Sequence, residues 1–525
     1  MLLPDLLDVT PTSPQQVLAQ YQQRFDDALA TGQNTPFVYP YNAFGPYLLI
    51  LYLCLPPSKS SIVYYARYPL FAIIVYLSVT AIVQCRSSMV TVGYGIGLLN
   101  AWAILWSATL IIFNDARADF KRIEEHESEA EELSGRLPNG DDQDNATGVD
   151  LSDGHAVKSR HPDGAVNQPE QMSKESIATK SRHFTWQTLP ASFLHRLDWV
   201  LDVVSNFRGV RWNHQISGMA PPPPQICSTI KDPKPPEHNE QSHLTRADLI
   251  RRDLPAFIAC YLVQDTLKYI TLQDPYFWSL SPKTPSPFPY PRAARTLLSL
   301  IFVYTSLLII FLLAPLVFGV LLGPKRIGQH AWPWLYAPYF GPISQVWQKG
   351  LAGLWGGWWH QVFRYAFEQA GEFAGRCTGL SEKSQLGAML RVVVAFACSA
   401  VLHGCAAYST LGNTKPISAS FAFFMLQPVG IIGQRALSAW LKKAGVREKI
   451  PKWLRGLGNV IVVVVWCSLT GPLVADDFAA TGLWLYEPVP VSFIRGLRGE
   501  GWWRWGGRWM WWYSAERWWQ NGLAF

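Results

Sequence analysis

Charged residues are scarce in this sequence of 525 residues: Asp, Glu, Lys and Arg make up 16% of it, and the formal net charge is +7. It has no concentrated basic stripe of the kind that grips a phosphate backbone, which argues against nucleic-acid binding. The eight cysteines include no Cys-x-x-Cys pair, and several lie inside apolar segments, where cysteine behaves as a small hydrophobic residue. Neither a disulfide framework nor a metal site is therefore expected.

Several catalytic motifs are also missing. The sequence contains no Gly-x-Ser-x-Gly nucleophile elbow, no His-Glu-x-x-His zinc motif, no Walker loop and no dinucleotide-binding fingerprint. The first 40 residues are polar and lack the basic-then-apolar pattern of a cleaved signal peptide. We therefore expect the first apolar segment to serve as the membrane-insertion signal.

Long apolar runs dominate what remains, and the hydrophobic content is 49%. Repeated, nearly uncharged stretches of about 20 residues are rare in soluble folds. The sequence thus predicts an all-α, polytopic membrane bundle of about eight spans. The first of these is short and could be re-entrant, and the predicted segments are Phe44–Leu55, Pro69–Cys85, Met89–Phe113, Leu254–Ile270, Ala294–Leu322, Leu386–Leu411, Ser418–Leu437 and Leu457–Leu473.

Composition divides the chain into five segments, which are a polar N-terminal tail (1–43), the first transmembrane segments (44–113), an acidic loop predicted to be disordered (114–185), a membrane domain (186–480) and a C-terminal tail (481–525). The acidic loop contains one glycosylation sequon at Asn145. Eight of the 24 tryptophans lie in the last 25 residues, interleaved with Arg504, Arg508 and Arg517. This pattern favours an interfacial anchor over a substrate-stacking role.

Polar residues inside the predicted spans are the first functional candidates. Asp265 and Lys268 are one helical turn apart and are expected to neutralise each other. His403 lies deep in an apolar run, where an ionisable residue is costly and is by default a functional hypothesis. On a helix its face also holds Ser399, Ala400 and residues 406–407, all small. Such a face could leave space for another molecule, or it could serve helix packing.

His360 is the second candidate, within the aromatic segment Leu354–Arg364. A histidine among tryptophans is often an interfacial residue, but Gly356 and Gly357 would let the backbone approach a ligand closely. Arg364, one turn later on a helix, could meet a phosphate group. A third histidine, His214, precedes a run of four prolines and is a weaker candidate.

Residues Trp355–Arg364 resemble the W-G-x-x-W-H-Q-x-F-R signature of fungal wax-synthase-like proteins, a branch of the membrane-bound O-acyltransferase superfamily. In that group a second histidine follows in a later apolar helix, and His403 matches it, 43 residues after His360. The Arg208–Pro224 region is similar to the same group, less specifically. The resemblance covers about residues 190–480. The family's two basic residues before Trp-His are replaced here by Gly357 and Trp358.

The resemblance implies an O-acyltransferase that moves an acyl group from an acyl-CoA co-substrate to a hydrophobic alcohol, with no bound cofactor and no metal. It implies His403 as general base and His360 as the group that orients the donor or stabilises the oxyanion. By the same resemblance, the residues that bind substrate or coenzyme A are Trp355, Trp359, Gln361, Arg364 and Ser399.

Two acceptor classes follow from the resemblance: terpenoid or meroterpenoid alcohols that receive acetyl from acetyl-CoA, which we favour, and long-chain alcohols that form wax esters. The family and the hydrophobic substrates also imply the endoplasmic reticulum. A transporter is the competing class, but the sequence lacks the paired interrupted spans typical of one.

Overall fold

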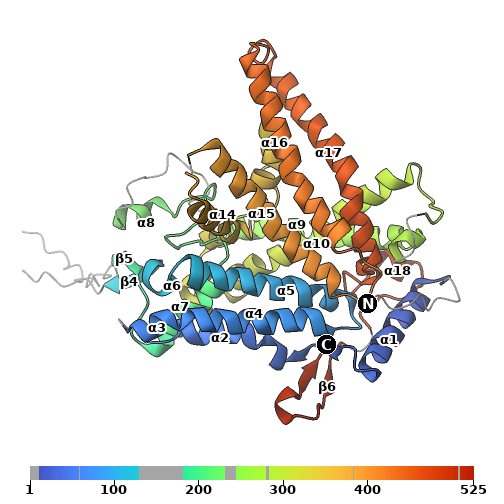
Figure 1. Cartoon of the computed structure of the whole chain (residues 1–525), viewed down its shortest axis with the longest axis horizontal. Coiled ribbons are helices and arrows are strands. Elements are labelled where there is room, and N and C mark those ends of the chain that lie inside the picture. The colour runs from blue at the N-terminus through green and yellow to red at the C-terminus, as the bar shows by residue number, and fades with distance from the viewer. Residues whose placement is uncertain are drawn as a thin grey trace, which may run out of the picture. The chain divides into compact units, whose positions relative to one another are not determined.

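A computed structural model describes residues 11–57, 60–128, 181–230, 244–278, 283–381, 383–506 and 509–525. They fall into two units: residues 1–123 with 186–525, and residues 124–185. The helices (Figure 1) are α1 (Pro14–Ala30), α2 (Phe44–Leu53), α3 (Ser61–Tyr65), α4 (Arg67–Gln84), α5 (Val90–Ala108), α6 (Ala116–Asp119), α7 (Phe193–Ser205), α8 (Pro224–Thr229), α9 (Arg246–Thr271), α10 (Pro291–Ala314), α11 (Pro324–Ile327), α12 (Ser344–Lys349), α13 (Leu351–Gly353), α14 (Arg364–Thr378), α15 (Gln385–Tyr408), α16 (Ala422–Lys443), α17 (Lys452–Ala480) and α18 (Phe493–Leu497).

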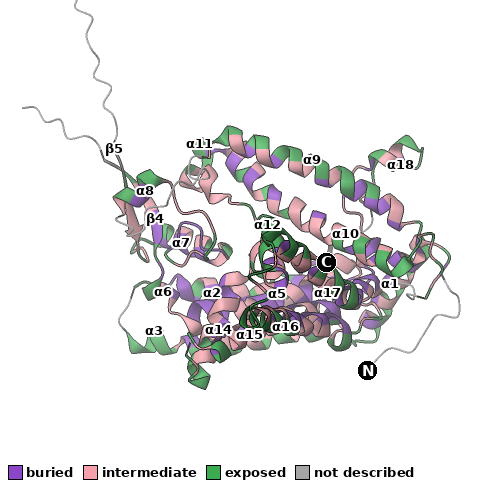
Figure 2. Ribbon diagram, turned by 90° about the horizontal axis from the view of Figure 1, so that it is seen from above, coloured by how far each residue is buried: buried purple, intermediate pink, exposed green. Residues whose placement is uncertain are grey.

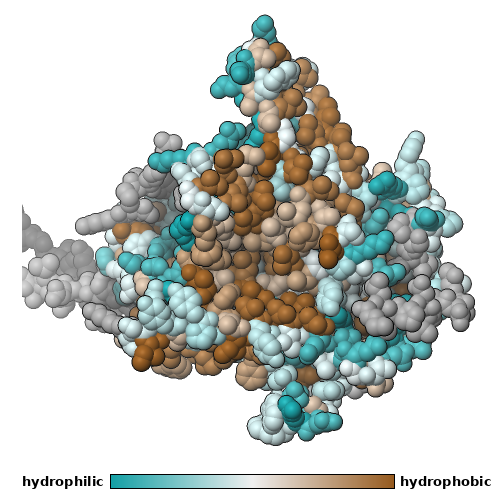
Figure 3. Space-filling model, in the orientation of Figure 1, coloured by the Kyte–Doolittle hydropathy of each residue, from teal (hydrophilic) through white to brown (hydrophobic). Residues whose placement is uncertain are grey.

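Six helical stretches among the described residues are long and apolar enough to cross a bilayer: Ser61–Gln84, Val90–Phe113, Pro291–Leu322, Gln385–Tyr408, Ile417–Lys443 and Lys452–Ala480. Figure 3 shows apolar side chains along α16 and α17 beneath a hydrophilic tip. Val429, Leu437, Ile461 and Leu469 on these helices are exposed, as expected for side chains that contact lipid. The chain is therefore an all-α membrane protein.

Two of the eight predicted segments are not among these six. Helix α2 has only ten residues, so at 1.5 Å per residue it covers about half of a hydrocarbon core. Helix α9 has 26 residues and lies alongside α10 (Figure 2). It begins at a capping box made by Thr245 and Asp248, which pairs otherwise unsatisfied groups at the helix start. Its buried polar side chains make it too polar to count as an apolar span.

The predicted pairing of Asp265 with Lys268 in α9 is wrong. Asp265 accepts hydrogen bonds from the Ser492 hydroxyl (2.5 Å) and the Ile494 backbone N–H (3.0 Å). Lys268 donates its Nζ proton to the carbonyl oxygen of Trp484 (2.7 Å). The two charges bind residues that are distant in sequence, and thereby attach α9 to the segment after α17.

Four helical stretches have π-helical hydrogen bonding: η2 (Thr109–Phe113), η5 (Pro315–Leu322), η8 (Leu354–Trp358) and η9 (Ile417–Phe421). Such wide turns are rare and often occur at functional sites. Stretch η8 contains the first tryptophan of the signature, Trp355, and ends just before the second, Trp359, and η9 leads into α16. Both lie in the part of the chain that contains the candidate histidines.

Helices α5 and α15 approach each other closely because α5 carries glycine at the contact. A Cβ atom on Gly97 would overlap the backbone oxygen of Cys405. The Ser409 hydroxyl accepts a hydrogen bond from the Gly97 N–H (2.9 Å) and donates one to the Gly93 carbonyl (2.7 Å). Small residues at a helix contact permit this close packing in membranes, and here they bring Tyr94 of α5 next to α15.

Short strands join the two ends of the chain. Strand β2 (Val38–Tyr39) pairs antiparallel with β7 (Gly522–Ala524), which pairs with β6 (Trp511–Tyr513), and β1 (Thr35–Pro36) pairs in parallel with β3 (Cys85–Arg86). Tryptophans around this sheet are exposed, among them Trp503, Trp512 and Trp518. An interfacial role for the tail stays a prediction, and its Arg508 lies outside the described residues.

The ends of the predicted disordered loop are ordered. Residues 116–119 form α6, and β4 (Arg122–Ser128) pairs with β5 (Ser181–Gln187). Residues 129–180, with the Asn145 sequon and most of the acidic run, lie outside the described residues. A prediction of disorder from composition therefore extended too far at both ends.

Candidate active site

His403 lies in α15, whose start is capped by the Ser384 hydroxyl. Its imidazole stacks on Phe424 of α16, with ring centroids 4.4 Å apart and planes at 13°. Its Nδ1 is 2.8 Å from the hydroxyl oxygen of Tyr94. The residue is half-buried, and within the described residues its Nε2 has no hydrogen-bond partner. This leaves Nε2 as the nitrogen that can meet a substrate.

The small residues beside His403 serve helix packing. Ala400, Ala406 and Ala407 are fully buried, and Gly97 of α5 contacts the backbone of Cys405. Of the two interpretations left open by the sequence, packing therefore accounts for these alanines. Ser399 is half-buried.

His360 lies two residues after the end of η8, and aromatic rings surround it. Its ring lies 5.4–6.0 Å, centroid to centroid, from the rings of Phe311, Phe340, Trp359 and Phe363. Its Nδ1 is buried and has no hydrogen-bond partner among the residues that the structure describes. Burial, and after it the neighbouring imidazole of His403, lower the pKa of His360 to about 3. The ring is thus neutral at physiological pH, and it lies outside the six candidate spans.

Trp355 links the two histidines. Its indole packs edge-on against Trp359 (5.9 Å), which contacts His360, and against Phe424 (6.4 Å), which stacks on His403. The indole N–H donates to the Gln427 side-chain oxygen at 3.2 Å. The structure therefore brings His360, Trp355, Trp359 and His403 into one aromatic cluster built from η8, α15 and α16.

Gln361 and Arg364 hold the η8 turn in place. Gln361 donates its side-chain N–H groups to the carbonyl oxygens of Trp355 (3.2 Å) and Trp359 (2.5 Å). Arg364 forms an ion pair with Glu368 (2.7 Å) and donates to Gln361 Oε1 (3.2 Å). Because Arg364 is already paired, binding a phosphate would require it to exchange Glu368 for the ligand.

The two glycines of the signature differ in their surroundings. A Cβ on Gly357 would lie 2.8 Å from the Cβ of Gln345, so this glycine permits close packing against α12, where a ligand contact was expected. Nothing lies within 4 Å of a Cβ on Gly356. Only Gly356 keeps open space beside it.

Sequence reasoning missed the partners of His403. Tyr94 comes from α5, Phe424 from α16, and Phe478 of α17 contacts both Tyr94 (5.7 Å) and His403 (6.4 Å). A tyrosine between two glycines in an otherwise plain apolar span was the available signal for Tyr94. The aromatic residues carried no signal, since phenylalanine is common in any span.

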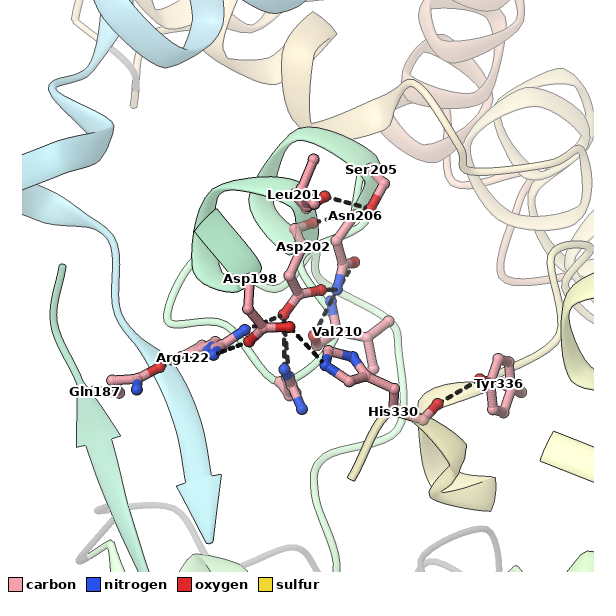
Figure 4. Close-up of polar contacts among 11 residues, drawn as sticks. Arg122, Gln187, Asp198, Leu201, Asp202, Ser205, Asn206, Val210, His330 and Tyr336 are labelled. Carbon is pink, nitrogen blue, oxygen red and sulfur yellow. Dashed lines mark hydrogen bonds and ion pairs between the residues drawn. The ribbon is translucent and has the colours of Figure 1, made fainter. Parts of the chain in front are cut away.

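A second polar centre, which contains neither His360 nor His403, is shown in Figure 4. We call Arg122, Asp198, Asp202, Arg211 and His330 the charged cluster. Asp202 accepts from Arg211 (2.8 Å) and Arg122 (3.3 Å), and Asp198 binds His330 (3.0 Å) and Arg122. The hydrogen bond from His330 and the Arg122 guanidinium hold the pKa of the Asp198 carboxyl well below its usual range.

The charged cluster holds residues 208–214 in place. These residues belong to the Arg208–Pro224 region, which resembles the fungal wax-synthase-like proteins less specifically than the Trp-His signature does. Arg211 has a φ of 66° and Gly209 a φ of 65°, so this turn contains left-handed backbone. His214 stacks on Phe120 at 4.0 Å, and burial lowers its pKa to about 3. In the described part of the chain neither ring nitrogen of His214 has a hydrogen-bond partner, and the contacts of this ring are those of a packed aromatic residue.

No group of three or more His, Cys, Asp or Glu side chains is arranged to hold a metal ion within the described residues. No disulfide joins any two of the eight cysteines, all of which lie in the described ranges.

Residues 336–426, which include both histidines, match the model of the membrane bound O-acyl transferase family. The chain is 31% identical over 169 residues to acetyltransferase ataH of Aspergillus terreus, covering 31% of this chain and 52% of that protein. It is 30% identical over 166 residues to acetyltransferase pyr8 of Aspergillus fumigatus, covering 31% of this chain and 38% of that protein.

A third similar protein is acetyltransferase aurG of Calcarisporium arbuscula, 27% identical over 171 residues, which are 32% of this chain and 39% of that protein. The chain thus spans about half the length, or less, of these curated relatives. No solved structure matches it significantly. With both histidines inside the matched region and six apolar helical stretches among the described residues, this chain is similar to the membrane-bound O-acyltransferase family and to these fungal acetyltransferases.

Proposed function

We propose that the chain is an acyl-CoA-dependent O-acyltransferase that moves an acetyl group from acetyl-CoA to the hydroxyl of a hydrophobic terpenoid or meroterpenoid alcohol. One observation carries the proposal: two half-buried imidazoles share one aromatic cluster, and the Nε2 of His403 lacks a protein partner within the described residues. The names of the relatives favour acetyl as the transferred group.

In the proposed reaction His403 is the general base. Its Nε2 accepts the proton of the acceptor hydroxyl while the hydroxyl oxygen attacks the thioester carbonyl. The carbon–sulfur bond then breaks, the acetyl ester forms, and the proton passes from Nε2 to the thiolate of coenzyme A. The reaction balances without a bound cofactor or metal, because acetyl-CoA is a co-substrate and the thiolate is a good leaving group.

His360 supports the same step as a neutral hydrogen-bond donor. A neutral imidazole carries one N–H, and its pKa of about 3 keeps it in that form at physiological pH. We place this N–H toward the thioester carbonyl oxygen, where negative charge develops. Trp355, Trp359 and Ser399 would line the acyl donor, while Gln361 and Arg364 hold the η8 turn that presents it.

The test uses microsomes from yeast, since we propose residence in the endoplasmic reticulum. Wild type, His403→Ala and His214→Phe are incubated with labelled acetyl-CoA or palmitoyl-CoA and a pool of terpenoid and long-chain alcohols. His214→Phe is the matched control, because it removes another buried imidazole without a partner. Acetyl ester from wild type and His214→Phe, but not from His403→Ala, is the expected result.

Other outcomes separate the alternatives. Preference for palmitoyl-CoA and long-chain alcohols would replace acetyl transfer by wax-ester synthesis. Equal ester formation by His403→Ala and wild type would overturn the base assignment. No ester from folded wild type, together with no thermal stabilisation by coenzyme A, would favour a transporter.

A further inference from the structure

The hydroxyl of Tyr94 is the closest polar group to the proposed base. Tyr94 lies in α5, outside the matched residues 336–426. Its Oη is 2.8 Å from His403 Nδ1, and its ring packs edge-on against Phe478 at 5.7 Å. Within the described part of the chain, neither this hydroxyl nor the His403 imidazole has another hydrogen-bond partner. Aromatic rings surround the pair, and Asp477 and His360 are close enough to interact with it electrostatically.

This hydrogen bond can exist in two forms, and they differ in what His403 can do. A phenolic hydroxyl both donates and accepts, and a neutral imidazole has one N–H and one lone pair. If Nδ1 donates to Tyr94 Oη, the lone pair is on Nε2, which can accept a proton. If Oη donates to Nδ1, then Nε2 carries the hydrogen and cannot act as a base.

We propose that Tyr94 is a positioning residue that accepts the Nδ1–H hydrogen bond and so fixes His403 in the tautomer with a basic Nε2. This inference rests on the proposed function. Only this form keeps the same hydrogen bond before and after Nε2 takes the proton of the alcohol. Once His403 is an imidazolium, the Nδ1–H···Oη bond becomes charge-assisted and stabilises the cation.

The packing of α5 supports such a role because it fixes Tyr94 at both sides. Ser409 hydrogen-bonds the backbone of Gly93 just before it and of Gly97 one turn after it. Gly97 has no room for a side chain against Cys405. The Tyr94 side chain is therefore fixed at one position along α15, with its hydroxyl in hydrogen-bond contact with the His403 imidazole.

The kinetic test compares Tyr94→Phe with Tyr52→Phe. Tyr94→Phe keeps the ring contacts and removes only Oη, and we expect kcat to fall by about 10- to 100-fold, with the KM for acetyl-CoA changed by less than about twofold. Tyr52→Phe also removes one tyrosine hydroxyl. That hydroxyl donates to the Val63 carbonyl (3.3 Å) and has no contact with either histidine among the described residues. This control should keep the wild-type kcat.

A second test reads the tautomer directly and needs no turnover. Protein labelled with 15N-histidine is placed in lipid nanodiscs, and the His403 signals are assigned by their loss in His403→Ala. We expect the Nδ1–H tautomer in wild type and a mixture of both tautomers in Tyr94→Phe. An Nε2–H tautomer in wild type would overturn the proposal whatever the activity.

The outcomes distinguish the two proposals. Full activity of Tyr94→Phe beside an inactive His403→Ala would overturn the positioning role of Tyr94 and leave the acyltransferase proposal standing. Full activity of His403→Ala would overturn the proposed mechanism itself. A fall in the thermal stability of Tyr94→Phe, with kcat per folded molecule unchanged, would assign Tyr94 a purely structural role.

Discussion

The chain contains two buried polar centres that are built in opposite ways. In the charged cluster, Arg122 and Arg211 are at most 2% exposed and are bound by Asp202 and Asp198. In the histidine site, counting the described residues, His360 Nδ1 has no hydrogen-bond partner and the His403 imidazole has one, Tyr94. The first centre consists of charged groups held by ion pairs, although Arg211 Nη1 has no hydrogen-bond partner among the described residues, whereas the second consists of neutral groups with unused hydrogen-bonding capacity.

This difference indicates which of the two centres could bind and react with a substrate. A buried charge that is fully paired stabilises one arrangement and offers nothing to a ligand. A buried polar atom without a partner costs free energy, and in the histidine site we propose that a substrate supplies the missing partner. Loss of a residue in the charged cluster should therefore reduce stability, and loss of a residue in the histidine site should reduce turnover.

The largest expected effect is on turnover by His403→Gln. Glutamine is similar in size and neutral, and it can still hydrogen-bond Tyr94, but it cannot take a proton. We expect kcat to fall by about 10²- to 10⁴-fold, the usual contribution of a general base, while thermal stability stays close to that of wild type. Ester formation by purified protein in detergent, with a melting curve beside it, measures both quantities.

The opposite pattern is expected for Asp202→Asn in the charged cluster. Asp202 is 12% exposed and is shared by Arg122 and Arg211, so the substitution leaves two buried guanidinium groups with less compensation. We expect the free energy of unfolding to fall by about 3–5 kcal/mol, with kcat per folded molecule retained. Asp198→Asn is the control, because Asp198 is 43% exposed and should cost less. An equal cost for both would contradict the assignment of the buried pair to Asp202.

A smaller effect is expected at the contact that brings Tyr94 to His403. Gly97→Ala would force α5 away from the Cys405 backbone, and overpacking of this kind costs about 1–3 kcal/mol. Gly95 lies in the same helix with nothing within 4 Å of its added Cβ, so Gly95→Ala should be neutral or stabilising by about 0.5–1 kcal/mol. Thermal unfolding of both variants checks this. A stable, fully active Gly97→Ala would show that the close approach is dispensable.

The two histidines could be predicted from the sequence because each carries a local signal: His360 stands in a tryptophan–glycine motif, and His403 is an ionisable residue in an apolar run. The membrane class was equally readable from the apolar runs. The residues that contact the histidines could not be predicted from the sequence. Tyr94 is 309 positions before His403, and no local pattern indicates which helix of a bundle faces which.

Local spacing also misled where a distant partner was stronger. Asp265 and Lys268 have the spacing of an ion pair, yet the chain around Trp484 and Ser492 binds each of them separately. The sequence predicts that a ligand approaches the backbone at Gly357, but the side chain of Gln345 occupies the space beside this glycine. Side-chain pairs within one helix are worth only a few tenths of a kcal/mol, so tertiary contacts override them easily.

The last prediction concerns stability at acid pH and has no effect at neutral pH. His360 has a pKa of about 3 in the folded protein, against about 6.5 in an unfolded chain. Between these values the unfolded chain binds a proton at this position and the folded protein does not. The free energy of unfolding therefore falls as the pH is lowered through this window, by about 1.4 kcal/mol per pH unit.

His360→Gln removes this dependence, so its stability should fall less steeply than that of wild type from pH 6.5 downward and run parallel to it above that pH. His214, whose pKa is also about 3, contributes its own equal dependence, and His214→Gln with the double variant tests whether the two add. Denaturant unfolding in micelles at a series of pH values measures the slopes. Identical slopes for wild type and His360→Gln would mean that the pKa of His360 is the same in the folded and the unfolded protein, and a desolvated aromatic cage around a neutral imidazole would then be the wrong description of this residue.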